Sequence, residues 1–163
     1  MRTDTIVHVV HVHAEGEVGD VVVGGIQPPP GDSLWEQARW VARDGALRAF
    51  LLNEPRGGVF RHVNLRVPAK DPSANVGFII MEPEDTPPMS GSNAMCVAAA
   101  LVETGQMPMV EPMTDVVLEA PAGVVRVRVA CSNGAVDSLS LTNVPSSVER
   151  RDEILSVPGI GDV

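Results

Sequence analysis

Apolar and polar residues alternate along several short stretches of the chain, which is the pattern of half-buried β-strands. β-Branched residues dominate these stretches, and glycine and proline separate them. The stretches expected to be strands are residues 5–13, the run that begins at Val21-Val22-Val23, and residues 59–67, 76–82, 116–119, 124–129 and 136–141. In the stretch 124–129, Arg126 and Arg128 fall on the polar face. Strands therefore dominate the predicted fold.

Two stretches have helical rather than alternating periodicity. The first begins at Ser33 with Glu36 three residues later, which is the capping-box pattern. It runs to about Asp44-Gly45, and the same periodicity resumes through Leu47, Phe50 and Leu51. The second covers residues 91–104 and is almost entirely apolar. A helix that is apolar on all sides has to be enclosed, so we expect an α+β fold in which a sheet wraps around this second helix.

Composition and charge narrow the classes of function. The chain has 21 acidic and 12 basic residues and a net charge of −9, which argues against a nucleic-acid surface and against binding to anionic membranes. No apolar run reaches the roughly 18 residues that span a membrane, and the alternating N-terminus does not match a signal peptide. The length of 163 residues suits one domain. Cys96 and Cys131 make no disulfide framework, so a reducing cytoplasm is the expected location.

The start of the second helix, Ser90-Gly91-Ser92-Asn93, is the main candidate site. The first backbone N–H groups of a helix have no intrahelical acceptor, and they mark the positive end of the helix dipole. They therefore offer a seat for a carboxylate or a phosphate, beside the hydroxyls of Ser90 and Ser92 and the amide of Asn93. A plain helix cap that binds nothing is the alternative, because serine is a favoured N-cap residue.

Other reactive side chains are expected to be structural. His11 and His13 would share one face of a strand while His8 points the other way, and no cysteine or carboxylate spacing completes a metal site. Cys96 lies six residues beyond Ser90, which is about 600° around the helix. A buried, inert thiol is therefore expected at this position.

Two loop segments carry charged residues. Glu54 and Arg56 lie in a turn rich in glycine and proline, where they are either solvated or folded over a ligand site, and their spacing does not decide between these alternatives. Glu82, Glu84 and Asp85 precede two prolines and are expected to form a solvated acidic loop.

A series of short motifs resembles the proline racemase family, which also contains hydroxyproline 2-epimerases and trans-3-hydroxyproline dehydratases. The motifs occur in the order of the family and cover nearly the whole chain, which makes the resemblance specific. They are His13-Ala-Glu-Gly16-Glu17, Gly24-Gly25, Pro30-Gly31, Leu47-Arg48, Glu54-Pro55-Arg56-Gly57, Pro88-Met89-Ser90-Gly91, Glu103-Thr-Gly105, Pro121-Ala-Gly123 and Asn143-Val-Pro145.

The resemblance implies the diaminopimelate-epimerase-like fold. In that fold each of two similar halves wraps a mixed sheet around a central helix, and the substrate lies in the cleft between the halves. This chain resembles the N-terminal half only, so residues 1–163 are expected to be one N-terminal catalytic half-domain without its C-terminal counterpart. A turn at Pro158-Gly159, followed by the start of a strand at Ile160, agrees with a chain that stops partway through a longer one.

The resemblance also implies a reaction without pyridoxal phosphate or metal. One base removes the α-proton of an imino acid, and a conjugate acid returns a proton to the other face. The typical motif at the first base is Met-Cys-Gly-His, where this chain has Met89-Ser90-Gly91-Ser92. Ser90 thus occupies the position of the catalytic cysteine and Ser92 that of the histidine. A serine hydroxyl is a far weaker acid than a thiol and needs an adjacent base.

The serine form shifts the expected substrate from proline toward hydroxyproline. The implied function is the N-terminal half of a hydroxyproline 2-epimerase that uses no cofactor, with Ser90 as one acid/base and the N–H groups of Gly91, Ser92 and Asn93 holding the substrate carboxylate. A trans-3-hydroxyproline dehydratase, a proline racemase and a non-catalytic module that binds imino acids or small anions are the alternatives. The second base would come from the C-terminal half or from a second copy in a homodimer, so the isolated chain is expected to be inactive.

Overall fold

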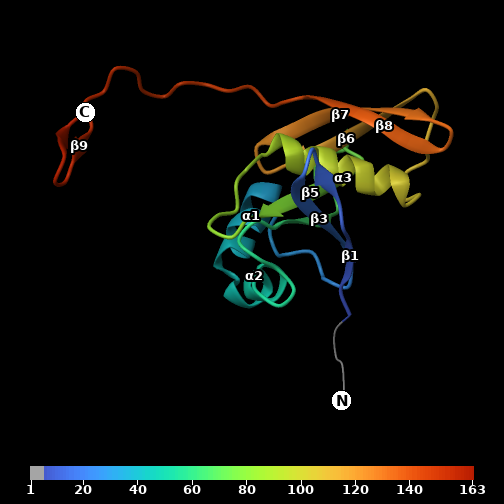
Figure 1. Cartoon of the computed structure of the whole chain (residues 1–163), viewed down its shortest axis with the longest axis horizontal. Helices are drawn as coiled ribbons and strands as arrows, with labels where there is room; N and C mark the ends of the chain where they lie inside the picture. The colour runs from blue at the N-terminus through green and yellow to red at the C-terminus, as the bar shows by residue number, and fades with distance from the viewer. Residues whose placement is uncertain (1–5) are drawn as a thin grey trace, which may run out of the picture.

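A mixed sheet of eight strands wraps around one buried helix in the computed structural model, which describes residues 6–163 (Figure 1). Three helices lie within these residues. The elements are β1 (His8–Val10), β2 (His13–Ala14), β3 (Glu17–Gly24), α1 (Leu34–Arg43), α2 (Gly45–Leu52), β4 (His62–Val67), β5 (Val76–Met81), α3 (Gly91–Glu103), β6 (Met113–Ala120), β7 (Gly123–Ser132), β8 (Ala135–Thr142), β9 (Ser156–Val157) and β10 (Gly161–Asp162).

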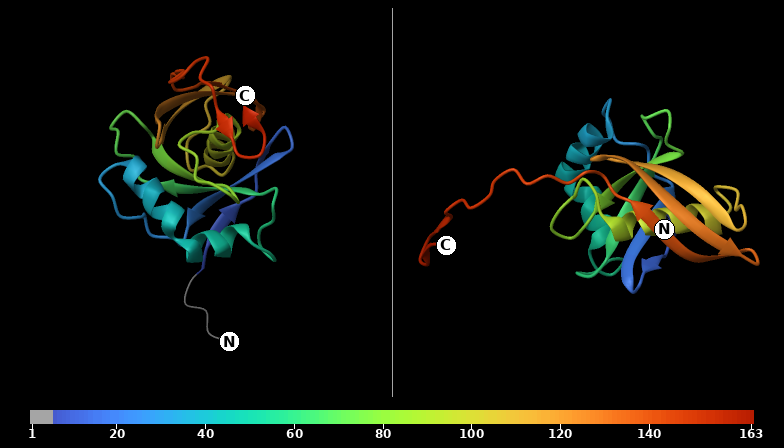
Figure 2. Two further views of the ribbon diagram at one scale, coloured as in Figure 1. Left: turned by 90° about the vertical axis from the view of Figure 1, so that its left-hand side faces the viewer. Right: turned by 90° about the horizontal axis from the view of Figure 1, so that it is seen from above.

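The sheet combines a mixed part with an antiparallel meander. Its order is β1-β3-β4-β5-β6-β7-β8, and β2 pairs with β3 beside β1. The pairs β3/β4 and β5/β6 are parallel, and the others are antiparallel. Seen end-on, α3 lies inside the curve of the strands, while α1 and α2 cover the outer face of the mixed part (Figure 2). The predicted α+β fold with an enclosed apolar helix is confirmed.

Successive residues of the central strands serve two different cores, because side chains alternate along a strand. Val21, Phe78 and Ile80 pack against α3 on the inner face of the sheet. Val22 and Ile79 pack against α1 and α2 on the outer face. All six residues of β5 are buried. The centre of the molecule therefore has three layers, with the sheet between α3 and the helix pair α1–α2.

The first helical stretch divides into two helices. The predicted capping box is present, because Ser33 Oγ accepts a hydrogen bond from the Glu36 N–H at 3.2 Å and the Glu36 carboxylate accepts one from the Ser33 N–H at 3.3 Å. Asp44 ends α1 and begins α2, and its carboxylate accepts the N–H groups of Ala46 and Leu47. The predicted continuation is thus a separate helix, and the expectation of two helices was wrong.

The strand predicted over residues 5–13 is interrupted, and Thr5 lies outside the described residues. β1 pairs with the later part of β3 and β2 with its beginning, so the chain between them breaks the alternation. His11 Nδ1 lies 3.0 Å from Asp20 Oδ2, whereas His13 Nδ1 accepts a hydrogen bond from the Gly16 N–H. The expectation that the two histidines share one strand face was therefore wrong.

The segment after β8 leaves the sheet. Residues 145–163 extend away from the wrapped sheet, and β9 and β10 form a small hairpin at the far end (Figures 1 and 2). The N–H of Ile160 bonds to the carbonyl of Val157 across the Pro158-Gly159 turn, as predicted. Among residues 6–163, no helix combines the length and the apolar character needed to cross a bilayer.

Candidate active site

Three polar side chains from distant parts of the chain meet at one edge of the sheet. Glu17 begins β3, His62 begins β4, and Glu82 follows β5. Because β3 and β4 are parallel and β5 is antiparallel to them, these three positions lie side by side. His62 Nδ1 is 3.3 Å from Glu17 Oε1 and 3.7 Å from Glu82 Oε1. Glu82 is thus half-buried beside a histidine, and the expectation that it belongs to a solvated loop was wrong.

The N-terminus of α3 meets the same edge. Asn93, in the first turn of α3, places its Nδ2 atom 3.4 Å from His62 Nδ1. In the neutral ring that carries its proton on Nε2, Nδ1 accepts from this amide, and in the doubly protonated ring Nδ1–H donates to Glu17 instead. The helix start, the imidazole and the two carboxylates therefore form one continuous polar site.

Ser90 caps α3 and is held by Asn93. Its backbone is extended, with φ −145° and ψ 133°, as an N-cap residue requires. Its Oγ atom accepts hydrogen bonds from the backbone N–H of Asn93 at 3.5 Å and from Asn93 Nδ2 at 3.0 Å. Ser92 Oγ lies 3.2 Å away. Within residues 6–163, Ser90 Oγ contacts no imidazole or carboxylate, so the adjacent base that serine needs is not in direct contact with it.

Two backbone donors at the start of α3 are free. The N–H of Ala94 bonds to the Ser90 carbonyl, and that of Asn93 points at Ser90 Oγ. The N–H groups of Gly91 and Ser92 have no acceptor in the part of the chain that the structure describes. The first turn carries no acidic side chain that could occupy them. This end of the helix can therefore bind a carboxylate through two parallel N–H groups.

A glycine allows α3 and β3 to approach closely. A Cβ atom on Gly19 would lie 2.8 Å from Cys96 Sγ and 3.1 Å from Asn93 Oδ1. Only glycine fits this position without displacing its neighbours. The predicted burial of Cys96 is confirmed, because its side chain is 1% exposed. Loss of hydration, with smaller contributions from the charges of Glu17 and Asp20, raises the pKa of this thiol to about 11.

Sequence reasoning found Ser90, Gly91, Ser92 and Asn93, which the structure brings together at one helix start. It missed His62, Asn64, Glu17 and the position of Glu82. His62 and Asn64 alternate with the apolar residues Val63, Leu65 and Val67 of the predicted strand, and this was the available signal. The convergence of Glu17 and Glu82 with His62 depends on strand pairing.

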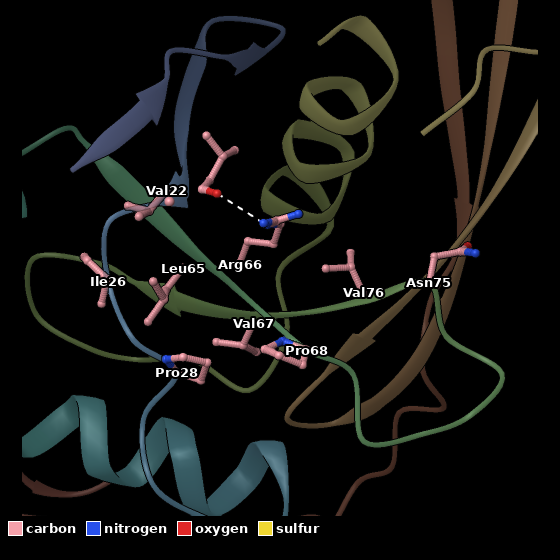
Figure 3. Close-up of a pocket in the computed structure, with 11 residues that line it drawn as sticks. Val22, Ile26, Pro28, Leu65, Arg66, Val67, Pro68, Asn75 and Val76 are labelled. Atoms are coloured by element: carbon pink, nitrogen blue, oxygen red, sulfur yellow. Dashed lines mark hydrogen bonds between the residues drawn. The ribbon is translucent and has the colours of Figure 1, made fainter. Parts of the chain in front are cut away.

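A cavity elsewhere in the fold does not provide a site. A cavity of about 360 Å³ lies at the opposite ends of β3 and β4, lined mostly by apolar residues such as Val22 and Leu65 (Figure 3). Its polar residues are already bonded, Arg66 Nη2 to the Val23 carbonyl and Asn75 Oδ1 to a backbone N–H. Between residues 6 and 163, no group of three His, Cys, Asp or Glu side chains is arranged so that it could hold a metal ion, and this includes Glu17, His62 and Glu82.

Comparison with known proteins shows the family to which the chain is similar. The family model described as proline racemase matches residues 9–163. The crystal structure of a hydroxyproline epimerase from Agrobacterium vitis with bound trans-4-hydroxy-L-proline has 42% sequence identity and a TM-score of 0.91, covering 100% of this chain and 48% of that one. A probable proline racemase from Agrobacterium radiobacter K84 with bound carbonate has 41% identity and a TM-score of 0.89, covering 97% of this chain and 47% of that one.

A more distant structure shares only the fold. Methylitaconate-delta-isomerase has 16% identity and a TM-score of 0.55, covering 99% of this chain and 41% of its own. The chain thus spans about half the length of the epimerase and the racemase that it matches. Since the family model covers almost all of its residues, the chain belongs to the proline racemase family.

Proposed function

We propose that the chain is the N-terminal half of a hydroxyproline 2-epimerase in which Ser90 carries a proton to or from the α-carbon. The observation that supports this most is the pair of free N–H groups, on Gly91 and Ser92, directly beside the Ser90 hydroxyl. A carboxylate held by those groups would present its α-carbon to that hydroxyl. The 42% identical relative with bound trans-4-hydroxy-L-proline supports an imino acid as the substrate.

The charges around the site suit a zwitterion. The helix start offers N–H donors for the substrate carboxylate, and Glu17 and Glu82 offer carboxylates that would attract its secondary ammonium group. A simple anion would meet only repulsion from these two side chains. The combination therefore favours an imino acid over phosphate or another small anion.

The chemical difficulty is the weak acidity of a carbon next to a carboxylate. As the α-proton leaves, negative charge moves onto the carboxylate oxygens, where the N–H groups of Gly91 and Ser92 and the helix dipole would stabilise it. The Asn93 N–H can join them when it leaves Ser90 Oγ. The opposing acid then adds a different proton to the opposite face of the same carbon, so the reaction inverts the centre without oxidation or reduction.

Ser90 has support for its charged form. Its Oγ atom accepts two N–H groups from Asn93, which would stabilise an oxyanion there, and Ser92 Oγ is near enough to share a hydrogen bond with the Ser90 hydroxyl. The opposing acid/base is expected from the second half of the family's chain or from a second copy. The proposal assigns each proton transfer to a side chain and therefore includes neither pyridoxal phosphate nor a metal.

The two free cysteines support a reducing compartment as the location of the protein. Cys96 and Cys131 are free and buried, which suits a protein that folds without disulfides in the reducing cytoplasm. We therefore retain the cytoplasm as the proposed location.

The function is tested with three substrates and one polypeptide that joins this chain to a second half of the family. Chiral chromatography should detect cis-4-hydroxy-D-proline from trans-4-hydroxy-L-proline. D-proline from L-proline would favour a racemase instead, and a pyrroline carboxylate from trans-3-hydroxy-L-proline would favour a dehydratase. If no substrate gives a product but calorimetry shows binding of pyrrole-2-carboxylate, the result would favour a non-catalytic binding module. The isolated chain serves as the control and should form no product.

A further inference from the structure

Asn64 is a fully buried amide at the contact between β4, β3 and α3. Its side chain is 0% exposed. Its Nδ2 atom lies 2.8 Å from Asn93 Oδ1, 3.2 Å from the Gly19 carbonyl oxygen and 3.4 Å from the Asp20 carbonyl oxygen. The two backbone carbonyls can only accept, so the NH₂ end of Asn64 must face them. The backbone of β3 thereby fixes which way this amide points.

The orientation of Asn64 determines that of Asn93. Since Asn64 donates toward α3, the oxygen of the Asn93 amide must face Asn64. The NH₂ end of Asn93 is then left to face Ser90 Oγ at 3.0 Å and His62 Nδ1 at 3.4 Å. Two hydrogens meet two acceptors, so each donor in this part of the network has a partner.

The orientation of Asn93 in turn decides the role of the Ser90 hydroxyl. With NH₂ facing it, Ser90 Oγ is an acceptor, and its own proton is free to move toward Ser92 or a ligand. If the amide were reversed, the Asn93 oxygen would accept that proton and hold it away from a ligand. One flip of a buried amide would therefore convert Ser90 from a proton carrier into a bound donor.

The buried Asn64 amide leaves one of its polar atoms without a hydrogen-bond partner. Asn64 Oδ1 is buried and has no hydrogen-bond partner within the described residues 6–163. An unsatisfied buried acceptor lowers the stability of the fold, and an apolar side chain of similar size would not carry this cost.

We propose that Asn64 is a positioning residue that orients the Asn93 amide, so that its NH₂ group and not its oxygen faces Ser90. The inference rests on the proposed function of Ser90 and adds to it a residue that reaches the site only through Asn93. It predicts that a change at Asn64 alters the chemistry of position 90 only while Asn93 keeps its amide.

The test places a titratable reporter at position 90. In a Ser90→Cys variant of the present chain, the pH dependence of alkylation by iodoacetamide gives the pKa of the new thiol. The native thiols interfere little, because Cys96 and Cys131 are buried and the pKa of Cys96 is raised to about 11. The unsubstituted chain measures their residual reaction. An N–H group that donates to the thiolate lowers the pKa, so its loss must raise it.

A double-mutant cycle in this background separates positioning from general disruption. Asn64→Leu and Asn93→Ala should each raise the thiol pKa by about one unit, which slows alkylation near neutral pH about tenfold. The two changes together should slow it no more than Asn93→Ala alone. An unchanged rate in the Asn64→Leu variant, or the same tenfold loss from Asn64→Leu when Asn93 is already alanine, would overturn the inference.

A second measurement covers the case in which the Asn64→Leu variant does not fold. In the unsubstituted chain, nuclear Overhauser effects should connect the Asn93 NH₂ protons with the Ser90 β-protons. Connections from those NH₂ protons to the Gly19 α-protons instead would show the reversed amide and refute the assignment. Neither measurement uses a substrate, so a failure to epimerise hydroxyproline would leave this inference standing, and the converse also holds.

Discussion

Asn93 joins the residues of the candidate site through both its backbone and its side chain. It donates twice to Ser90, once to His62, and accepts from Asn64. Its side chain is 1% exposed, so none of these bonds competes with bulk water. Ser90 is thereby held in place by a residue that is itself fixed by the sheet. These contacts fix the position of a serine hydroxyl that is by itself only a weak acid.

The neighbouring thiol gives a prediction for stability. The pKa of Cys96 is about 11 in the folded chain against an ordinary 9.0. Below both pKa values the thiol is neutral in the folded and in the unfolded chain, so it contributes fully to stability. As the pH rises through this window the unfolded chain loses its proton first, so stability falls. The advantage of the native chain over a Cys96→Ala variant should shrink by about 2 kcal/mol between about pH 8 and about pH 10.5.

Urea denaturation of both proteins across this range measures the effect. Other titrating groups contribute equally to the two proteins and cancel in the difference. A difference in the free energy of unfolding that stays constant with pH would contradict the assignment of a raised thiol pKa.

At the scale of elements, the start of α3 provides the proposed carboxylate seat. Gly91→Pro removes one of its two free N–H groups, and proline is well tolerated at the first position of a helix. Ser90 is extended with φ −145° and ψ 133°, which suits a residue before proline. A Cβ atom on Gly91 would meet only Leu141 Cδ2, at 3.6 Å. Loss of one charge-assisted hydrogen bond should raise KM about tenfold.

Gly91→Ala is the matched control, because it adds the Cβ atom and keeps the N–H group. KM for the imino acid is measured in the polypeptide that carries both halves, and thermal denaturation checks that the two variants are equally stable. Equal KM values for the proline and alanine variants would show that the Gly91 N–H group does not bind the substrate.

Local signals allowed the helix starts to be predicted from the sequence. Each helix start depends on residues within one turn, namely Ser33 with Glu36 and Ser90 after two prolines, so the local sequence is enough to identify it. The division between α1 and α2 was missed because Asp44 serves as the cap of both helices. The break near His11 was missed because β1 and β2 pair with different parts of β3. The alternation of residues within the segment carries no information about this pairing.

The other half of the site could not be predicted in the same way. Glu17, His62 and Glu82 are far apart in the sequence and meet only through the pairing of β3, β4 and β5. Glu82 follows the last residue of a buried strand, which local composition assigns to a loop. The resemblance to the family pointed to Ser90 but not to Asn64 and His62, which contact Asn93 from β4, because those contacts depend on tertiary structure.

At the scale of the whole molecule, the fold presents one half of the proposed proton-transfer site. Ser90, Gly91 and Ser92 are only half-buried, although the helix behind them is enclosed. The chain spans about half the length of the epimerase and the racemase that it matches. In the proposed reaction the second half would cover this opening and place the opposing base across the substrate from Ser90. Exclusion of water would then strengthen every charge interaction at the helix start.

Exchange of the α-proton with solvent deuterium tests the central claim most directly. In D₂O the polypeptide with both halves should incorporate deuterium at the α-carbon of trans-4-hydroxy-L-proline, as followed by proton NMR. Ser90→Ala should slow this exchange at least about 100-fold, because general acid–base catalysis by one group is of that size, whereas Ser90→Cys should retain it. A Ser90→Ala variant that exchanges at the rate of the native protein would contradict the account.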